Sequence, residues 1–203
     1  MKANENRISN MLNKIILTGF CLLAFSNFLP AQENDVFKKD YIKSTMIKVA
    51  NWQIGNPKHD VNFWANGAFY AGVFATYETT RSDALKNSMM QTFDKINWQP
   101  AKRFDHADDI AISQTYIDLY RLKKDRKYIQ PSIDAIKKIG VDESPQIKNH
   151  GIIWWWCDAL FMAPPTFAKL AKVTKDKTYL EMNDKFFQET YDRLYNKKKK
   201  LFA

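Results

Sequence analysis

A repeating unit of two helices joined by a short charged turn limits what this chain can fold into. Three turns carry the repeat, and they align on Asp83, Asp125 and Asp176. A mostly apolar segment precedes each turn, and a segment with apolar residues three and four positions apart follows it. The turns recur at roughly 40 to 50 residues, a longer period than that of a tetratricopeptide unit. Stacked units of this kind bury one row of helices against another.

The apolar pattern predicts an all-α fold. The segment 64–77 is apolar on almost every side, so we expect it to be buried on every side. Two architectures fit the repeat: an α-solenoid, or an α/α toroid with inner and outer rings of helices. The long loops all precede the buried helices, which gathers these loops at one end of the stack. Helices are predicted over residues 36–53, 64–77, 82–93, 108–122, 128–139, 166–173 and 179–195.

The N-terminus has the pattern of a secretory signal peptide over residues 1–32. A basic segment ends at Lys14, an apolar run covers 15–29, and Ala31 supplies a small residue for cleavage. The alternative is a membrane anchor, but the run is short for a spanning helix. We therefore predict export to the periplasm or the medium, without stable membrane insertion after cleavage, and a single domain over 33–203. Lipid attachment at Cys21 stays open.

Charge and cysteine content narrow the possible partners. The net charge is +9, which favours an anionic ligand, and the run of four Lys at 197–200 is interpreted as a solvated loop. We expect no nucleic-acid partner. Cys157 alone remains after signal cleavage, so no intrachain disulfide can form. The three His are scattered along the chain, and neither a metal site nor a cofactor is predicted.

Three consecutive Trp, 154–156, are followed closely by Asp158. Aromatic faces suit a sugar ring, and a carboxyl group walled by indoles loses hydration, which raises its pKa. A raised pKa lets a carboxylic acid donate a proton near neutral pH. The alternative is a buried Asp that caps a helix beside core tryptophans. Pro164 and Pro165 cannot lie deep in one helix, so Asp158 is expected on a short helical segment at a cavity mouth.

Polar residues gather at the predicted starts of the buried helices. If the repeat is correct, residues 63–67, 105–109 and 156–158 share one rim. Helix capping explains one Asp at such a position. Asp105, Asp108 and Asp109 together carry more negative charge than a cap requires, which favours a functional site.

The residues at this rim resemble those of glycoside hydrolase families 105 and 88, the unsaturated rhamnogalacturonyl and glucuronyl hydrolases. The resemblance implies an (α/α)6 barrel of six hairpins, of which 33–203 would be the N-terminal part, an incomplete ring of about seven helices. An incomplete ring raises the expectation that this stretch alone is inactive. The motifs are Trp64-Ala65-Asn66-Gly67-Ala68-Phe69, His106-Ala107-Asp108-Asp109-Ile110-Ala111 and Trp156-Cys157-Asp158-Ala159-Leu160-Phe161-Met162.

The resemblance also implies a reaction and its residues. The substrate would be an oligosaccharide, of rhamnogalacturonan or a similar polymer, with a 4,5-unsaturated uronic acid at its non-reducing end. Hydration of that double bond would release the sugar. Asp158 matches the general acid/base and Asp109 the second active-site Asp, with Asp108 a close rival. The expected substrate contacts are Trp64, Asp108, His106 and Trp156, although His106 has no specific role.

Two other classes of function stay open at the level of sequence. A non-catalytic helical-repeat module could bind a glycan or a protein at the Trp rim. Another α/α-toroid enzyme, a glycosidase or a polysaccharide lyase, is also compatible with the pattern. A lyase would need a Tyr or His base, for which Tyr70 and His106 are available.

Overall fold

The computed structural model describes residues 35–139 and 142–202, so the predicted signal peptide lies outside the described residues. The chain divides into two units, 1–42 and 43–203. The described part of the first unit contains the 3-10 helix η1 (Asp35–Phe37) and the beginning of α2 (Lys39–Gly55). Among the described helices, none is both long enough and apolar enough to cross a membrane.

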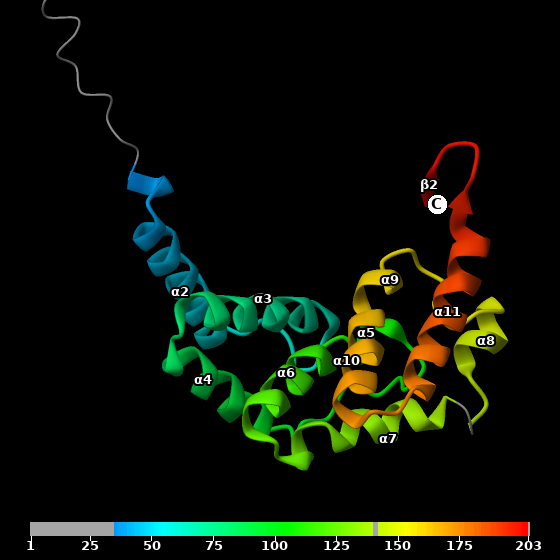
Figure 1. Cartoon of the computed structure of the whole chain (residues 1–203), viewed down its shortest axis with the longest axis horizontal. Helices are drawn as coiled ribbons and strands as arrows, with labels where there is room; N and C mark the ends of the chain where they lie inside the picture. Colours follow the sequence, from blue (N-terminus) through cyan, green and yellow to red (C-terminus); the bar gives the residue numbers. More distant parts are fainter. Residues whose placement is uncertain (1–34, 140–141, 203) are drawn as a thin grey trace, which may run out of the picture. The chain divides into compact units, whose positions relative to one another are not determined.

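The second unit consists almost entirely of helices, which confirms the predicted all-α class (Figure 1). Its one sheet is a two-stranded antiparallel hairpin of β1 (Tyr195–Asn196) and β2 (Leu201–Phe202) around the exposed Lys turn. Seven described α-helices, counting α2, have nine or more residues. The helices that follow α2 are α3 (Trp64–Thr80), α4 (Asp83–Asp94), α5 (Ala107–Ile110), α6 (Ser113–Lys123), η2 (Arg126–Tyr128), α7 (Gln130–Lys138), α8 (Pro145–His150), α9 (Ala159–Met162), α10 (Pro164–Thr174) and α11 (Thr178–Leu194).

The long helices form successive hairpins around a central helix. Helix α3 packs on α4, α6 leads through η2 into α7, and α10 packs on α11. Helix α6 contacts both α3 and α10, and every residue from Ser113 to Leu119 is buried. Aromatic rings join the hairpins: Phe93 meets Tyr116 edge to face, and Trp98 stacks on Tyr128 with ring centroids 4.0 Å apart. Large buried rings of this kind contribute strongly to a helical core.

The three predicted turns share one backbone conformation. Each first helix ends on a residue in the left-handed conformation, Arg81, Lys124 or Lys175, with φ of 59°, 60° and 64°. The next residue then accepts a hydrogen bond from a backbone amide that follows it, as Ser82 and Asp125 do. The repeat therefore aligns Ser82, not Asp83, with Asp125 and Asp176. The predicted alignment was wrong by one residue in the first turn, because Ser and Asp are interchangeable as helix caps.

Helix α3 differs from its predicted environment. Gly67, Tyr70, Val73, Phe74 and Tyr77 are buried, but Gly72 and Ala75 are exposed. The expectation that 64–77 is buried on every side is therefore wrong for this structure. The described chain covers only one face of α3, whereas it covers α6 on all sides from Ser113 to Leu119.

The predicted helix over 108–122 is interrupted. It separates into α5 and α6, with Ala111 and Ile112 between them. At this point α3 comes very close: a Cβ added to Gly67 would lie 2.9 Å from both the Ala111 Cβ and the Ile112 nitrogen. Only a residue without a side chain permits this approach. The interruption leaves α5 as a short separate helix ahead of α6.

Candidate active site

Two four-residue helices, α5 and α9, lie in contact with each other. Each precedes a long inner helix, α6 or α10. Pro164 and Pro165 begin α10, where proline is tolerated, and they separate α9 from it. Asp158 occupies the N-cap position of α9, so it stands on a short helical segment as expected. Its side chain accepts no capping hydrogen bond, which argues against a purely structural cap.

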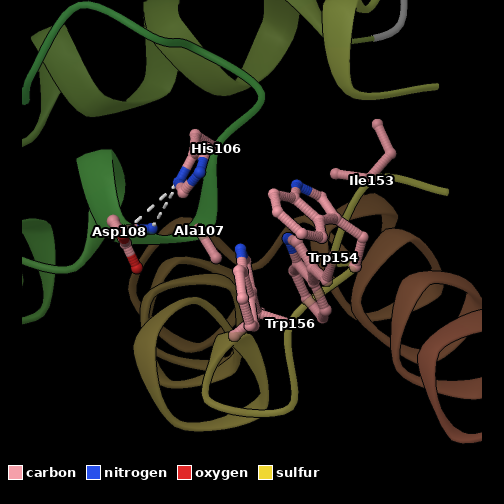
Figure 2. Close-up of a pocket in the computed structure, with 8 residues that line it drawn as sticks. His106, Ala107, Asp108, Ile153, Trp154 and Trp156 are labelled. Atoms are coloured by element: carbon pink, nitrogen blue, oxygen red, sulfur yellow. Dashed lines mark hydrogen bonds and ion pairs between the residues drawn. The ribbon is translucent and has the colours of Figure 1, made fainter. Parts of the chain in front are cut away.

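Asp108 lies on α5 and faces the Trp segment (Figure 2). It lines a small pocket of about 10 Å³ together with His106, Ala107, Ile153, Ala159 and the three tryptophans 154–156. Burial raises the pKa of Asp108; the carboxylates of Asp158 and Asp109 add to this effect, and the charges of His106 and Arg103 oppose it. Asp158 is thus near enough for its charge to act on Asp108. The carboxyl group with a raised pKa in this site is Asp108.

His106 fixes the start of α5. Its Nδ1 accepts a hydrogen bond from the Asp108 amide at 3.3 Å and lies 3.7 Å from the Asp108 carboxylate. Burial lowers the pKa of His106, Arg103 acts in the same direction, and the nearby carboxylates oppose it. An Nδ1 that accepts a hydrogen bond belongs to the neutral imidazole with its proton on Nε2. His106 therefore acts here as a helix cap that orients the Asp108 backbone.

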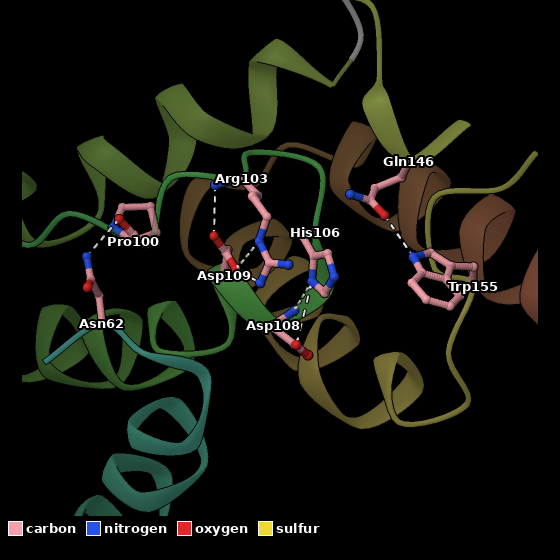
Figure 3. A network of polar contacts seen from close by, with 8 residues as sticks. All are labelled: Asn62, Pro100, Arg103, His106, Asp108, Asp109, Gln146 and Trp155. Atoms are coloured by element: carbon pink, nitrogen blue, oxygen red, sulfur yellow. Dashed lines mark hydrogen bonds and ion pairs between the residues drawn. The ribbon is translucent and has the colours of Figure 1, made fainter. Parts of the chain in front are cut away.

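Asp109 points to a different partner (Figure 3). Its carboxylate accepts hydrogen bonds from the Arg103 backbone amide at 2.8 Å, from Nε at 3.0 Å and from Nη2. Asp109 is 5% exposed, so the pair neutralises a buried charge. Asp109 and Trp64 line a second pocket, of about 310 Å³, whose other walls are Asp60, Asn62, Phe63, Ala101, Lys102 and Arg103.

The three tryptophans have different environments. Trp154 is 1% exposed and packs edge to face on Phe167 and Phe186. Trp155 donates to the Gln146 Oε1 at 2.8 Å and stacks on His150. Trp156 is 54% exposed. Because Asp158 is also exposed, the expectation that indoles wall in its carboxyl group is wrong. Trp156 is the most exposed of the three, with its ring centroid 4.5 Å from that of Trp155.

The structure thus brings the predicted residues together in two neighbouring groups. Asp108, His106 and Trp156 line one pocket, with Asp158 close to Asp108, and Trp64 and Asp109 line the other. Asp105 belongs to neither pocket. It is buried and accepts hydrogen bonds from Ser144 Oγ at 2.7 Å and from the Gln146 amide at 2.9 Å, so it ties the loop before α5 to α8.

The structure changes the roles expected of Tyr70 and Arg103. Tyr70, considered as a lyase base, is buried in the core against Phe93, and burial raises its pKa, so it is poorly suited to accept a proton. Arg103 was not singled out from the sequence. The sequence shows a cation six positions before Asp109. Because Arg103 lies in a loop, no helical or strand period indicates which way its side chain points. Within 35–139 and 142–202, no three His, Cys, Asp or Glu residues could hold a metal ion.

Two proteins with similar sequences carry the same name, unsaturated 3S-rhamnoglycuronyl hydrolase. The one from Formosa agariphila is 35% identical over 98% of this chain and 54% of its own length. The one from Alteromonas sp. strain LOR is 32% identical over 79% of this chain and 47% of its own length. The chain therefore spans about half the length of the curated relatives it matches.

Two solved structures share the fold. A polysaccharide lyase superposes with a TM-score of 0.66 at 22% identity, covering 80% of this chain and 50% of the lyase. A glycosyl hydrolase family 88 protein from Bacteroides vulgatus superposes with a TM-score of 0.64 at 20% identity, covering 79% of this chain and 51% of that protein. The likeness to the second confirms the predicted α/α-toroid class. The model of glycosyl hydrolase family 88 matches residues 32–203, and the chain belongs to that family.

Proposed function

We propose that this chain carries an active-site region of a hydrolase that removes a 4,5-unsaturated uronic acid from the non-reducing end of an oligosaccharide. Membership of family 88 supports this proposal. The shared name of the two curated relatives favours a uronic acid linked to rhamnose. The observation that carries the proposal is the carboxyl pair of Asp108 and Asp158 beside the exposed ring of Trp156.

The pair offers an acid and a base to one reaction. Asp108 is partly buried and has a raised pKa, mainly because of that burial, whereas Asp158 is exposed. A carboxyl group with a raised pKa keeps its proton to higher pH, so Asp108 can supply a proton beside Asp158. The acid would protonate C4 of the unsaturated sugar, and the carboxylate would take a proton from the water that attacks C5. The net change is the addition of one water across the double bond. The resulting hemiketal opens, and the glycosidic bond is lost without a glycosyl-enzyme intermediate.

We assign the proton transfer to Asp158, because it is exposed to a bound sugar and accepts no capping hydrogen bond. Asp108, with its raised pKa, would hold a proton or return it to Asp158. Trp156 would stack on the sugar ring, and Trp64 would contact the sugar in the neighbouring pocket. In this scheme Asp109 takes no part in proton transfer, in contrast to the role that the family resemblance implied.

The experiment is Asp158→Asn in the full-length protein, with an oligosaccharide generated by a polysaccharide lyase as substrate. Loss of the ultraviolet absorbance of the double bond reports turnover. We expect the rate to fall by at least about 100-fold, because a general acid or base contributes 10² or more. The control is Asp184→Asn on the exposed surface of α11, which should leave the rate unchanged.

Three other results would contradict the proposal. Full turnover by Asp158→Asn would remove Asp158 from the proton transfer. Binding without turnover by the unsubstituted protein would indicate a non-catalytic module. A rise in absorbance on an uncut polyuronate would indicate a lyase.

We also propose that residues 1–32 direct export and that 33–203 belong to one catalytic domain. The basic and apolar pattern of the N-terminus supports export. Fusion of residues 1–32 to a reporter enzyme, followed by fractionation of the cells, tests this part separately. A reporter that stays in the cytoplasm would contradict it.

A further inference from the structure

Arg103 holds Asp109 by both its backbone and its side chain. The backbone amide of Arg103 reaches one carboxylate oxygen of Asp109, and Nε and Nη2 reach the other. Two residues earlier, the Ala101 amide donates to the Asp109 carbonyl at 3.0 Å. The loop before α5 is thus fastened to α5 at the backbone and at the side chain of one residue. A helix of four residues has little rigidity of its own, so this attachment sets its orientation.

The orientation of α5 determines where Asp108 points. Asp108 and Asp109 are consecutive, and consecutive helical side chains point about 100° apart. With Asp109 fixed on Arg103, Asp108 faces His106 and the Trp segment (Figure 3). The same attachment occupies both Asp109 oxygens with donors.

Arg103 also belongs to the small set of charges that act on Asp108. This set consists of His106 at the start of α5, Asp109 on α5, Asp158 at the start of α9, and Arg103 in the preceding loop. Two of these neighbours are carboxylates, and Arg103 is the one permanent cation. Its charge opposes the carboxylates at Asp108 and also disfavours the charged form of His106.

We propose that Arg103 is a positioning residue: by holding Asp109 it aims Asp108 at the pocket beside the Trp segment, and its charge acts on Asp108 there. The inference rests on the proposed function for its kinetic test. It gives Asp109 the role of an anchor for Arg103 and leaves proton transfer to Asp108 and Asp158.

The test is the pH dependence of kcat/KM in the full-length protein with Arg103→Gln, Arg103→Lys and Asp109→Asn. Arg103→Gln removes a cation and leaves Asp109 without its partner, so the profile should move to higher pH while kcat falls about 10- to 100-fold. Asp109→Asn removes a carboxylate and frees the Arg103 charge, so the profile should move to lower pH. Arg103→Lys keeps the positive charge but loses the paired donors of the guanidinium. We therefore expect kcat to fall while the pH profile of kcat/KM stays unchanged.

A structural role alone would lower activity without moving the profile, and that result would overturn the inference. Loss of all turnover in Asp109→Asn at every pH would also overturn it, because Asp109 would then be a proton carrier. Arg193→Gln, a change of an exposed residue on α11, is the matched control and should affect neither kcat nor the profile. Arg103→Lys and Asp109→Asn keep the inference testable where Arg103→Gln does not fold.

A second measurement does not depend on turnover. The carboxyl carbon of Asp108 can be titrated by NMR in the unsubstituted protein and in the Arg103 variants, without substrate. We expect the Asp108 midpoint to rise in Arg103→Gln and to stay in place in Arg103→Lys. An unchanged midpoint in Arg103→Gln overturns the inference. A raised midpoint in a protein that does not act on the unsaturated sugar supports the role of Arg103 and contradicts the proposed function instead.

Discussion

At the scale of single residues, each role in the polar cluster follows from the partner that the side chain meets: Arg103 holds Asp109, and His106 lies beside Asp108. The sequence predicted that residues 105–109 and 156–158 come together, and they do. It could not tell Asp108 from Asp109, because the difference depends on Arg103, which lies in a loop without periodicity. It also could not separate the three tryptophans. Their environments depend on tertiary contacts. Trp155 meets Gln146, and Trp154 meets Phe167 and Phe186, which lie on later helices.

Asp108 provides a prediction about stability at this scale. Because burial raises its pKa, the ionised form is less favourable in the folded than in the unfolded chain. This cost is absent below the ordinary value of 3.8 and is fully present above the folded-state pKa. Asp108→Asn should therefore raise the free energy of unfolding at neutral pH, with a gain that shrinks as the pH falls toward 3.8. Urea unfolding over this pH range measures it.

The control for that prediction is Asp184→Asn, which lies exposed on α11. Its effect on unfolding should be small at every pH. A loss of stability in Asp108→Asn at neutral pH would mean that the contact of Asp108 with His106 outweighs the cost of burying its charge.

At the scale of elements, helix periods and turn chemistry made most of the secondary structure predictable. The predicted return helices over 82–93, 128–139 and 179–195 correspond to α4, α7 and α11 within two residues at every boundary. The interruption between α5 and α6 was not predictable, because the segment contains no Gly or Pro. It follows from the close approach of α3 at Gly67, which is a tertiary contact.

The left-handed turn residues give a prediction at the element scale. Lys175 has a φ of 64°, a conformation that costs a residue with a Cβ about 1 kcal/mol and costs glycine little. Lys175→Gly should therefore increase the free energy of unfolding by up to about 1 kcal/mol. Lys172→Gly, three residues earlier inside α10, should decrease it by about 1 kcal/mol. Chemical denaturation of both variants tests the pair, and equal effects of the same sign would contradict it.

At the scale of the whole second unit, the repeat predicted the hairpins but not the exposure of their faces. The described chain surrounds α6 with other helices, whereas one face of α3 is open. An all-round apolar sequence shows that a helix can be buried on every side. Which sides are buried depends on the elements that pack against it. The repeat left an α-solenoid and an α/α toroid open, and the family resemblance of the rim residues favoured the toroid.

Two glycines of α3 test how the hairpins pack. Gly67 lies against Ala111 and Ile112, and an added Cβ would come within 2.9 Å of them, so Gly67→Ala should destabilise the fold by about 1 to 3 kcal/mol. Gly72 has nothing within 4 Å of such a Cβ. Gly72→Ala should therefore stabilise the helix by up to about 1 kcal/mol, since Ala is the better helix former. Thermal unfolding compares the two, and a stable Gly67→Ala would show that α3 can shift away.

The long helices form the scaffold, and the polar residues of the candidate site lie at the two short helices α5 and α9. The long helices α6 and α10 are constrained by packing, whereas the polar residues of the site lie on α5 and at the start of α9. A change of sugar preference could thus arise in the segments 103–109 and 156–159 while the scaffold stays as it is. Exchange of these two segments between family members is accordingly the smallest change that could transfer specificity. Arg103 and Asp109 have to be exchanged together, because each holds the other.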